Sequence, residues 1–226
     1  MGLGRRARRR SALEKSLSES EAIAIHELIA VSRSLFERGY SFGTAGNVSV
    51  RMGGTVLSTP TGSSLGTLTA ERLARSDLQG NVSGPNKPTK ELPFHLAVYR
   101  ARPESYAVVH LHSTYATAVS CLRDLNIEDA LPVLTPYYGM RIPCLPVVPY
   151  LPPGDPQLGS EVEKWVIHTP ALLLRNHGSI AVGATLAEAA ALAEEIEETA
   201  RLFLILGGRG QALSPDQVAE LRHRFK

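Results

Sequence analysis

Apolar residues along the chain follow two different spacings. Between Ile25 and Phe36 they recur every three or four positions, which predicts a helix with one buried face. Over 47–51 and 55–58 apolar and polar residues alternate in steps of two, on either side of Gly53-Gly54. This alternation around a glycine turn predicts a β-hairpin.

The same two spacings recur through the rest of the chain. They predict helices over 89–102, 161–168 and 185–206 and from Ser214 onward, and strands over 106–112, 171–175 and 179–182. Eight prolines lie between Leu131 and Pro156. No long helix can persist there, so we expect extended segments and loops. The alternation of strands and helices predicts an α/β fold, and the hairpins indicate a largely antiparallel or mixed sheet.

The length of 226 residues suits one domain. Five arginines fall within residues 5–10 and account for more than the whole net charge of +2, so the rest of the chain is slightly acidic. We expect a basic, disordered tail over 1–17 and a single domain over 18–226, in which Ser18 and Glu21 form a capping-box pattern. With aromatic residues at only 6%, this composition argues against nucleic-acid binding.

The two cysteines and the hydropathy pattern bear on location. Cys121 and Cys144 form no disulfide framework, and we interpret both as small core residues in a reducing compartment. No apolar run approaches the roughly 18–20 residues that a membrane span needs. We therefore expect a cytoplasmic protein that binds no membrane.

Three histidines have the spacing of a metal site. His110 and His112 are two residues apart on a predicted strand, so their side chains point to the same face and can converge on one ion. His177 lies in a predicted turn, from which a third ligand can project at a different angle. Three neutral imidazoles plus an open position are typical of catalytic Zn²⁺, although a His-x-His pair alone is often an ordinary strand feature.

Glu91 opens the helix that leads into the His-x-His strand. The helix dipole favours its anionic form there, which is also a purely structural reason for its presence. As a functional group it could ligate the metal, or act as a general acid or base once substrate binds. Residue pattern alone leaves both roles open.

Three short segments are suited to binding an anion. Residues 43–47 and 59–64 are loops rich in Gly, Thr and Ser, whose backbone N–H groups can approach phosphate oxygens. Thr89 and Lys90 lie at a predicted helix start, another common phosphate site. For any one loop, a simple turn is the plainer explanation.

Taken together in this order, the motifs resemble those of the class II aldolase/adducin family. They are Gly-Thr-Ala-Gly-Asn-Val-Ser (43–49), Thr-Pro-Thr-Gly (59–62), the Glu91 helix, His-Leu-His-Ser-Thr-Tyr-Ala (110–116) and Arg-Asn-His-Gly (175–178). The resemblance covers about residues 28–206. It implies a central, mostly antiparallel sheet flanked by helices, and a homotetramer with one Zn²⁺ or other divalent metal per subunit.

The resemblance also implies roles for individual residues. The metal ligands fall on His110, His112 and His177, and the catalytic carboxylate, also a ligand, falls on Glu91. The phosphate-binding positions fall on the set Asn47, Thr61, Gly62, Thr89 and Lys90. A tyrosine from a neighbouring subunit protonates the intermediate in related aldolases; Tyr137 is the better candidate, and the alternative is that Tyr137 and Tyr138 are interface packing.

Two features of the sequence narrow the expected activity. Lys90 stands where the fuculose-phosphate aldolases have serine, which indicates a more negatively charged substrate. The segment 131–159 is similar to that of decarboxylases acting on phosphorylated sugar acids. We therefore expect a carbon–carbon lyase that converts a 3-oxo-tetronate 4-phosphate to dihydroxyacetone phosphate and CO₂.

Three alternatives remain. A fuculose-phosphate type aldolase would use the same metal site. A 4-epimerase is less favoured because that group has Asp where this chain has Glu91. An adducin-like binding protein is also less favoured, because those members lose the metal ligands and this chain keeps all three histidines.

Overall fold

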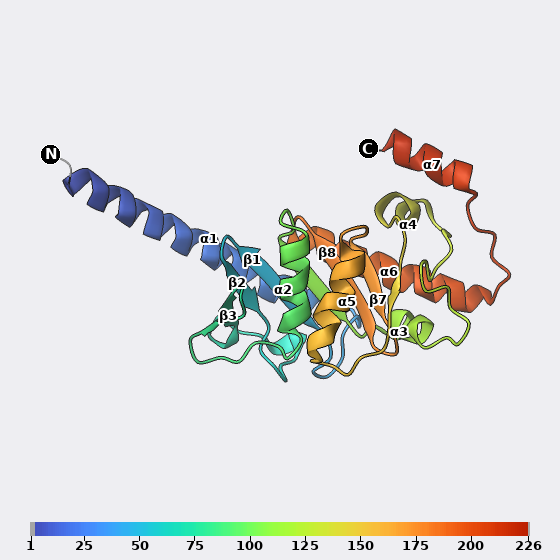
Figure 1. The fold of residues 1–226 in the computed structure, drawn as a ribbon, viewed down its shortest axis with the longest axis horizontal. Coiled ribbons are helices and arrows are strands. Elements are labelled where there is room, and N and C mark those ends of the chain that lie inside the picture. Colours follow the sequence, from blue (N-terminus) through green and yellow to red (C-terminus); the bar gives the residue numbers. More distant parts are fainter. Residues whose placement is uncertain (1–2, 226) are drawn as a thin grey trace.

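The computed structural model describes the backbone of residues 3–225 and the side chains of residues 19–225. Its strands are β1 (Asn47–Met52), β2 (Thr55–Ser58), β3 (Ala74–Asp77), β4 (Val82–Ser83), β5 (Ala107–Leu111), β6 (Val147–Val148), β7 (Ala171–Leu174) and β8 (Gly178–Gly183). They form one sheet in the order β4-β3-β2-β1-β5-β8-β7-β6 (Figure 1). Only the β6–β7 pair is parallel among these strands, so the expected mostly antiparallel sheet is confirmed.

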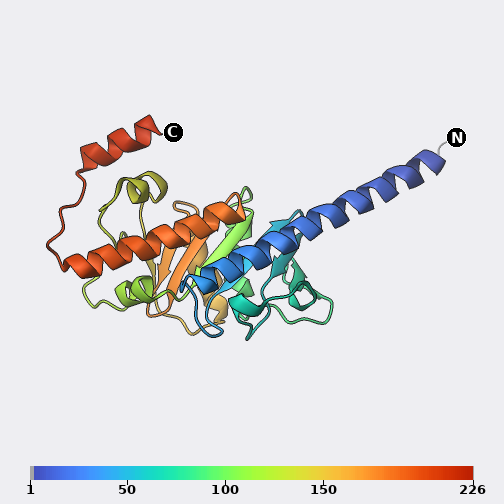
Figure 2. The ribbon, with the colours of Figure 1, turned by 180° about the vertical axis from the view of Figure 1, so that it is seen from behind.

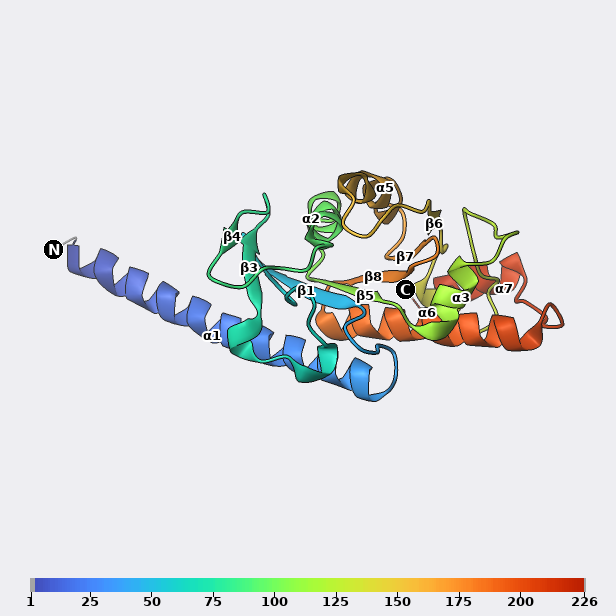
Figure 3. The same cartoon turned by 90° about the horizontal axis from the view of Figure 1, so that it is seen from below.

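Helices cover both faces of this sheet. They are α1 (Leu3–Glu37), α2 (Leu92–Ala101), α3 (Thr114–Ser120), α4 (Pro136–Arg141), α5 (Pro156–Val166), α6 (Leu186–Leu206) and α7 (Pro215–Arg224), with short 3₁₀ turns at Leu65–Thr67 and Ala70–Arg72. Helices α1 and α6 lie on one face and α2 and α5 on the other (Figure 3). Seen from the α1 and α6 side, α6 runs across the sheet and α7 lies beyond it (Figure 2). The fold is therefore an α/β three-layer arrangement.

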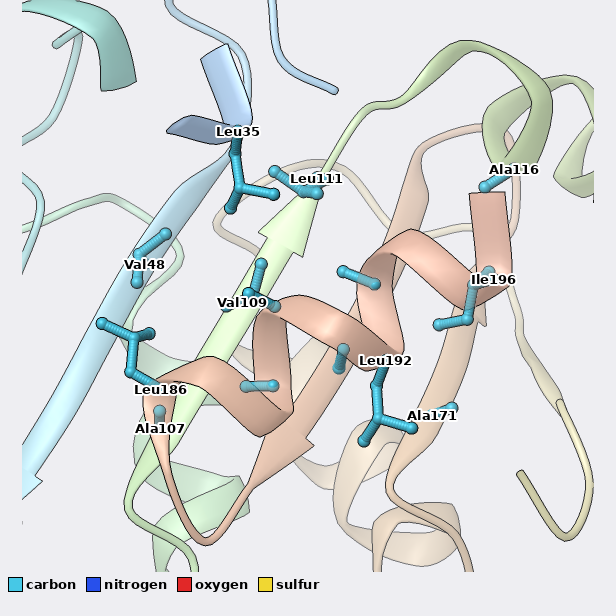
Figure 4. Packing of buried hydrophobic residues seen from close by; sticks show 14 of the residues in the cluster. Leu35, Val48, Ala107, Val109, Leu111, Ala116, Ala171, Leu186, Leu192 and Ile196 are labelled. Atoms are coloured by element: carbon cyan, nitrogen blue, oxygen red, sulfur yellow. The ribbon is translucent and has the colours of Figure 1, made fainter. Parts of the chain in front are cut away.

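Two apolar clusters join the layers. In one, Val109 and Leu111 of β5 belong to the same core as Leu192 and Ile196 of α6 (Figure 4). In the other, Val108 packs with residues of α2 and α5. Because side chains alternate along a strand, His110 shares the face of Val108. The sheet therefore directs His110 toward α2.

The helix boundaries correct several predictions. Helix α1 continues back to Leu3, so Ser18 lies inside it instead of capping it. Residues 5–17 are mostly Arg, Ala, Leu, Glu and Lys, which are strong helix formers. The boundary between a disordered tail over 1–17 and one domain over 18–226 stays a prediction. Helix α5 begins five residues before the predicted 161, because Asp155 caps it and Pro156 fits the first turn.

The proline-rich segment contains one helix that was not predicted. Thr135 caps α4 by accepting a hydrogen bond from the backbone N–H of Tyr138, and Pro136 lies in the first turn, where proline is tolerated. The last predicted helix is confirmed as α7, with a complete capping box between Ser214 and Gln217.

Two further observations concern location. Among the described residues, no helix combines the length and the apolar character needed to span a membrane. Both cysteines are free, but Cys121 is exposed and Cys144 is half-buried, so neither is the core residue expected. Cys121 is the C-cap residue of α3, where the chain leaves this helix for a loop.

Candidate metal centre and active site

The first two candidate ligands come from β5. His110 is the fourth residue of this strand and is fully buried, and His112 follows its last residue. Their Nε2 atoms lie 2.9 Å apart. The His-x-His pair therefore converges as its spacing predicted.

The third histidine is held by a sharp turn between β7 and β8. Asn176 adopts the left-handed conformation with φ 55°, which asparagine tolerates better than most residues. At Gly178 a Cβ atom would lie 2.1 Å from the carbonyl oxygen of Leu111, so only glycine fits against β5. This close approach places the His177 ring 4.9 Å from that of His110 and 4.6 Å from that of His112, between ring centroids.

Glu91 provides the fourth candidate ligand, from the start of helix α2. It is the N-cap residue of α2 and is 3% exposed. Its Oε2 lies 3.3 Å from Nε2 of His110, and its Oε1 lies 3.2 Å from Nε2 of His177. One ligand atom from each of the four residues lies within 4.8 Å of all the others.

The electrostatics suit a cation. Burial lowers the pKa of His110 to about 3 and that of His112 to about 4, so both imidazoles are neutral at pH 7. Burial alone would raise the pKa of Glu91, but the neighbouring His110, His177 and Asn47 hold that pKa below its ordinary value. Neutral imidazoles around a carboxylate are the protonation states that metal binding requires.

Unsatisfied atoms give a direct test of the fit. Oε1 of Glu91 and Nε2 of His177 are buried without a hydrogen-bond partner in the part of the chain described. Nδ1 of His110 lies 2.8 Å from the carbonyl oxygen of Ser179. Donation to that oxygen fixes the proton on Nδ1 and leaves the Nε2 lone pair directed at the cluster. These donors fit a divalent metal ion.

A cavity of about 400 Å³ opens directly beside this cluster. Its wall includes Glu91, His112 and His177, together with every residue assigned to phosphate binding: Asn47, Thr61, Gly62, Thr89 and Lys90. Three segments far apart in the sequence thus meet at one hollow. The structure therefore brings together the positions that the family resemblance implied, and their role in binding phosphate stays a prediction.

Backbone hydrogen bonds fasten the 59–64 loop to the segment that precedes α2. The N–H of Thr61 donates to the carbonyl of Lys87 at 3.1 Å, and that of Thr89 donates to the carbonyl of Thr59 at 3.0 Å. Thr89 does not cap α2 as predicted; its Oγ1 accepts from the N–H of Glu91 at 3.2 Å, because α2 begins only at Leu92. The threonine closes the turn that aims Glu91.

Lys90 lies on the exposed rim of the cavity. Its positive charge contributes to the lowered pKa of His112, after burial and the neighbouring His177. The loop before α5 packs against it: a Cβ atom added at Gly154 would lie 3.4 Å from the carbonyl oxygen of Lys90. The adjacent Pro153 also lines the cavity, although no individual role was predicted for it within the segment 131–159.

Other lining residues were also missed as individuals. Phe42, Thr44, Ala45 and Ser63 line the cavity, and all but Phe42 belong to the two Gly/Thr/Ser loops. Those loops were the available signal. Phe42 is an exposed aromatic residue next to the first loop, and nothing in the sequence singles it out.

Tyr137 is not brought to this site within the chain. It lies in α4, its side chain is 63% exposed, and it does not line the cavity. Tyr138, by contrast, is buried. Any contact of Tyr137 with substrate therefore requires a second subunit.

The strand order and the site together indicate one class of protein. In this site, histidines of a central strand face a glutamate at the start of a helix. The family model "Class II Aldolase and Adducin N-terminal domain" matches residues 26–204. The chain belongs to the class II aldolase/adducin family.

Individual relatives of the chain carry more specific activities than the family name gives. The chain is 50% identical over 210 residues to the 3-oxo-tetronate 4-phosphate decarboxylase of Pectobacterium atrosepticum, covering 92% of this chain and 96% of the relative. It is 38% identical to an L-fuculose phosphate aldolase of Methanococcus maripaludis, covering 80% and 96%. The crystal structure of YgbL from Klebsiella pneumoniae superposes with a TM-score of 0.87 at 45% identity, covering 89% of this chain and 99% of that chain.

The cluster predicts that one metal ion depends on all of its ligands. Replacing His112 with Ala should remove the metal and the activity, because it takes away one of the three imidazoles expected to hold the ion. Metal content measured by mass spectrometry on purified protein, alongside activity, checks this. The exposed His168, replaced with Ala, serves as control and should leave both unchanged. Full activity after exhaustive chelation would contradict the prediction.

Proposed function

We propose that this chain is a metal-dependent carbon–carbon lyase that decarboxylates a 3-oxo-tetronate 4-phosphate to dihydroxyacetone phosphate and CO₂. The observation that carries the proposal is the Glu91–His cluster at one side of a cavity that is lined by asparagine, threonine and serine and has a lysine on its rim. The 50% identity to the decarboxylase of Pectobacterium atrosepticum over nearly the whole chain supports this substrate.

The chemistry of the substrate matches this site. A 3-oxo-tetronate 4-phosphate is a β-keto acid with a hydroxyl group next to its ketone. The bond between its carboxylate carbon and the adjacent carbon breaks, and the electron pair stays on the substrate as an enediolate while CO₂ leaves. When bound, the metal supplies Lewis-acid stabilisation for this developing charge. Protonation of the carbon then gives dihydroxyacetone phosphate.

The chain's own residues divide the remaining work. His110, His112 and His177 would hold the ion, for which we propose Zn²⁺, one per subunit. Glu91 faces both these ligands and the cavity, so its carboxylate can accept or return a proton at the substrate oxygens. For the phosphate we propose the donors of the two loops and of the turn before α2: Asn47, Thr61, Gly62, Thr89 and Lys90.

Aldol cleavage is the alternative that a specific observation favours. The 38% identity to an L-fuculose phosphate aldolase spans 80% of the chain, and such an enzyme could use the same cluster. Both reactions break a carbon–carbon bond to leave an enediolate, and they differ only in the departing group. We place the decarboxylase first because of Lys90 and the greater identity to decarboxylases.

The products discriminate these two activities. Incubation with a 3-oxo-tetronate 4-phosphate should release CO₂ and dihydroxyacetone phosphate in equal amounts, with no aldehyde product. The measurement is a coupled assay for each product, run in parallel with a ketose 1-phosphate. Aldehyde release from the ketose 1-phosphate, with no CO₂ from the keto acid, would assign the chain to the aldolases.

Lys90 gives a second test, directed at substrate charge. Replacing Lys90 with Ser should weaken binding of the phosphorylated keto acid by about 1–3 kcal/mol, as expected for one charge-assisted hydrogen bond. The loss should appear in KM if the lysine contacts a remote phosphate, because that contact is equal in the ground and transition states. Steady-state kinetics separate the two parameters.

The matched control for Lys90 is Lys164→Ser. Lys164 is an exposed lysine of α5 paired with Glu161, and such surface pairs contribute little. It should leave KM and kcat unchanged. A loss confined to kcat in Lys90→Ser would instead place the ammonium near the departing carboxylate, and no loss at all would make it an ordinary surface lysine.

For assembly we propose a cytoplasmic homotetramer in which Tyr137 reaches the site of a neighbouring subunit and donates the proton. Tyr137→Phe should then lower kcat by about 10²–10⁴-fold, the usual contribution of a general acid. Tyr150→Phe is the control, because Tyr150 is similarly exposed in the same proline-rich segment. Light scattering that shows a fully active monomer would refute the shared site.

A further inference from the structure

We propose that Asn47, His95 and Ser49 form a directional hydrogen-bond relay that fixes the Glu91 carboxylate from behind, which makes His95 a positioning residue of the metal site. The proposal rests on the proposed function only in that Glu91 acts in the site. None of the motifs used above assigns a role to His95 or Ser49.

The relay arises from matched repeats on two elements. Glu91, His95 and Tyr99 recur every four residues, from the N-cap of α2 along one side of the helix, a rise of roughly 6 Å per step. Asn47 and Ser49 recur every two residues on β1, a rise of roughly 6–7 Å. The two sets of side chains therefore interleave between helix and strand.

Each neighbouring pair is within hydrogen-bond distance. Nδ2 of Asn47 lies 2.8 Å from Oε2 of Glu91, and Oδ1 of Asn47 lies 2.5 Å from Nε2 of His95. Nδ1 of His95 lies 2.7 Å from Oγ of Ser49, which in turn lies 2.8 Å from the Tyr99 hydroxyl. The five side chains form one unbroken line.

The chemistry of the end group sets the direction of the whole line. The ionised Glu91 carboxylate only accepts, so Asn47 must turn its NH₂ group to it and its carbonyl oxygen to His95. That oxygen requires a proton on Nε2 of His95, and the neutral ring then presents Nδ1 as an acceptor to the Ser49 hydroxyl. The oxygen of Ser49 is thereby left to accept from Tyr99.

Burial makes this direction costly to reverse. All five residues are at most 6% exposed, so solvent cannot compensate a broken step. His95 also stacks on Phe94, with ring centroids 4.6 Å apart and planes inclined by 17°. Both nitrogens of His95 are used in the relay, which excludes it as a fourth imidazole ligand.

Loss of the N–H donor of His95 should change the position of Glu91, at the other end of the line. Without it, the buried Asn47 carbonyl oxygen has no donor, so the amide would turn or shift to find one and would no longer hold Oε2 of Glu91 at 2.8 Å. The carboxylate would then rotate away from His110 and His177. Asn47 keeps one N–H beyond the relay, so this role is compatible with a contact to phosphate.

The test compares variants of the full-length protein by three measurements. These are the affinity of the metal-free protein for Zn²⁺ by titration, kcat and KM with the keto acid, and the thermal midpoint. His95→Phe, which keeps an aromatic ring, should lower zinc affinity and kcat by about 10–100-fold, the usual effect of losing a partner behind a metal ligand. KM should change little.

Two variants separate positioning from packing. His95→Gln restores one donor and one acceptor, so it should recover part of both losses relative to His95→Phe. Ser49→Ala should give a smaller loss in the same direction. Its matched control is Ser58→Ala: Ser58 pairs directly with Ser49 across β1 and β2, is equally buried, and its hydroxyl has no hydrogen-bond partner among the described residues.

The outcomes are distinct. Wild-type zinc affinity and kcat in a folded His95→Phe protein would overturn the relay, as would Gln and Phe variants that behave alike. If His95→Phe does not fold, Ser49→Ala decides: a loss of kcat absent from Ser58→Ala supports the relay, and equal behaviour overturns it. Wild-type protein that binds zinc but leaves the keto acid unchanged would refute the proposed function and leave the zinc comparison valid.

Discussion

The site depends on the close approach of the β7–β8 turn to the end of β5. Gly178 lies so close to Leu111 that there is no room for a Cβ atom. Because this contact fixes His177 relative to His110 and His112, three imidazoles from two segments more than sixty residues apart share one point. Glu91 lies next to these imidazoles only because α2 packs on the face of the sheet to which His110 points.

The cluster shows how burial and function coincide here. Taking Glu91 and His110 out of water would be unfavourable for an isolated charge. The arrangement avoids much of that cost by keeping His110 neutral and by giving the carboxylate a hydrogen bond from Asn47. What remains unpaired, one oxygen of Glu91 and one nitrogen of His177, is what a cation would satisfy. Two of the buried polar atoms that lack a partner among the described residues thus lie at the candidate metal site.

Much of the fold and of the site could be predicted from the sequence, because the signals for them lie within single elements. The alternation around Gly53-Gly54 and the His110-x-His112 spacing are properties of single strands, so the hairpin and the ligand pair were recovered. The position of Tyr137 could not be derived, because it depends on packing between segments and subunits. The short helix α4 was missed because its prolines obscured a cap at Thr135. The contacts of His95 could not be derived, because its partners on β1 become neighbours only when α2 docks.

The place of β5 in the sheet has a consequence for how a metal ion held by this cluster would exchange with solution. This strand is hydrogen-bonded on both sides, to β1 and to β8, and its apolar residues contribute to both core clusters. Amide hydrogens in such a strand exchange with solvent mainly when the whole molecule opens. His110 therefore cannot leave the cluster through a local fluctuation, whereas His177, on a turn, can. Exchange of the ion with solution should accordingly follow opening of the β7–β8 turn, at a rate unrelated to that of global unfolding.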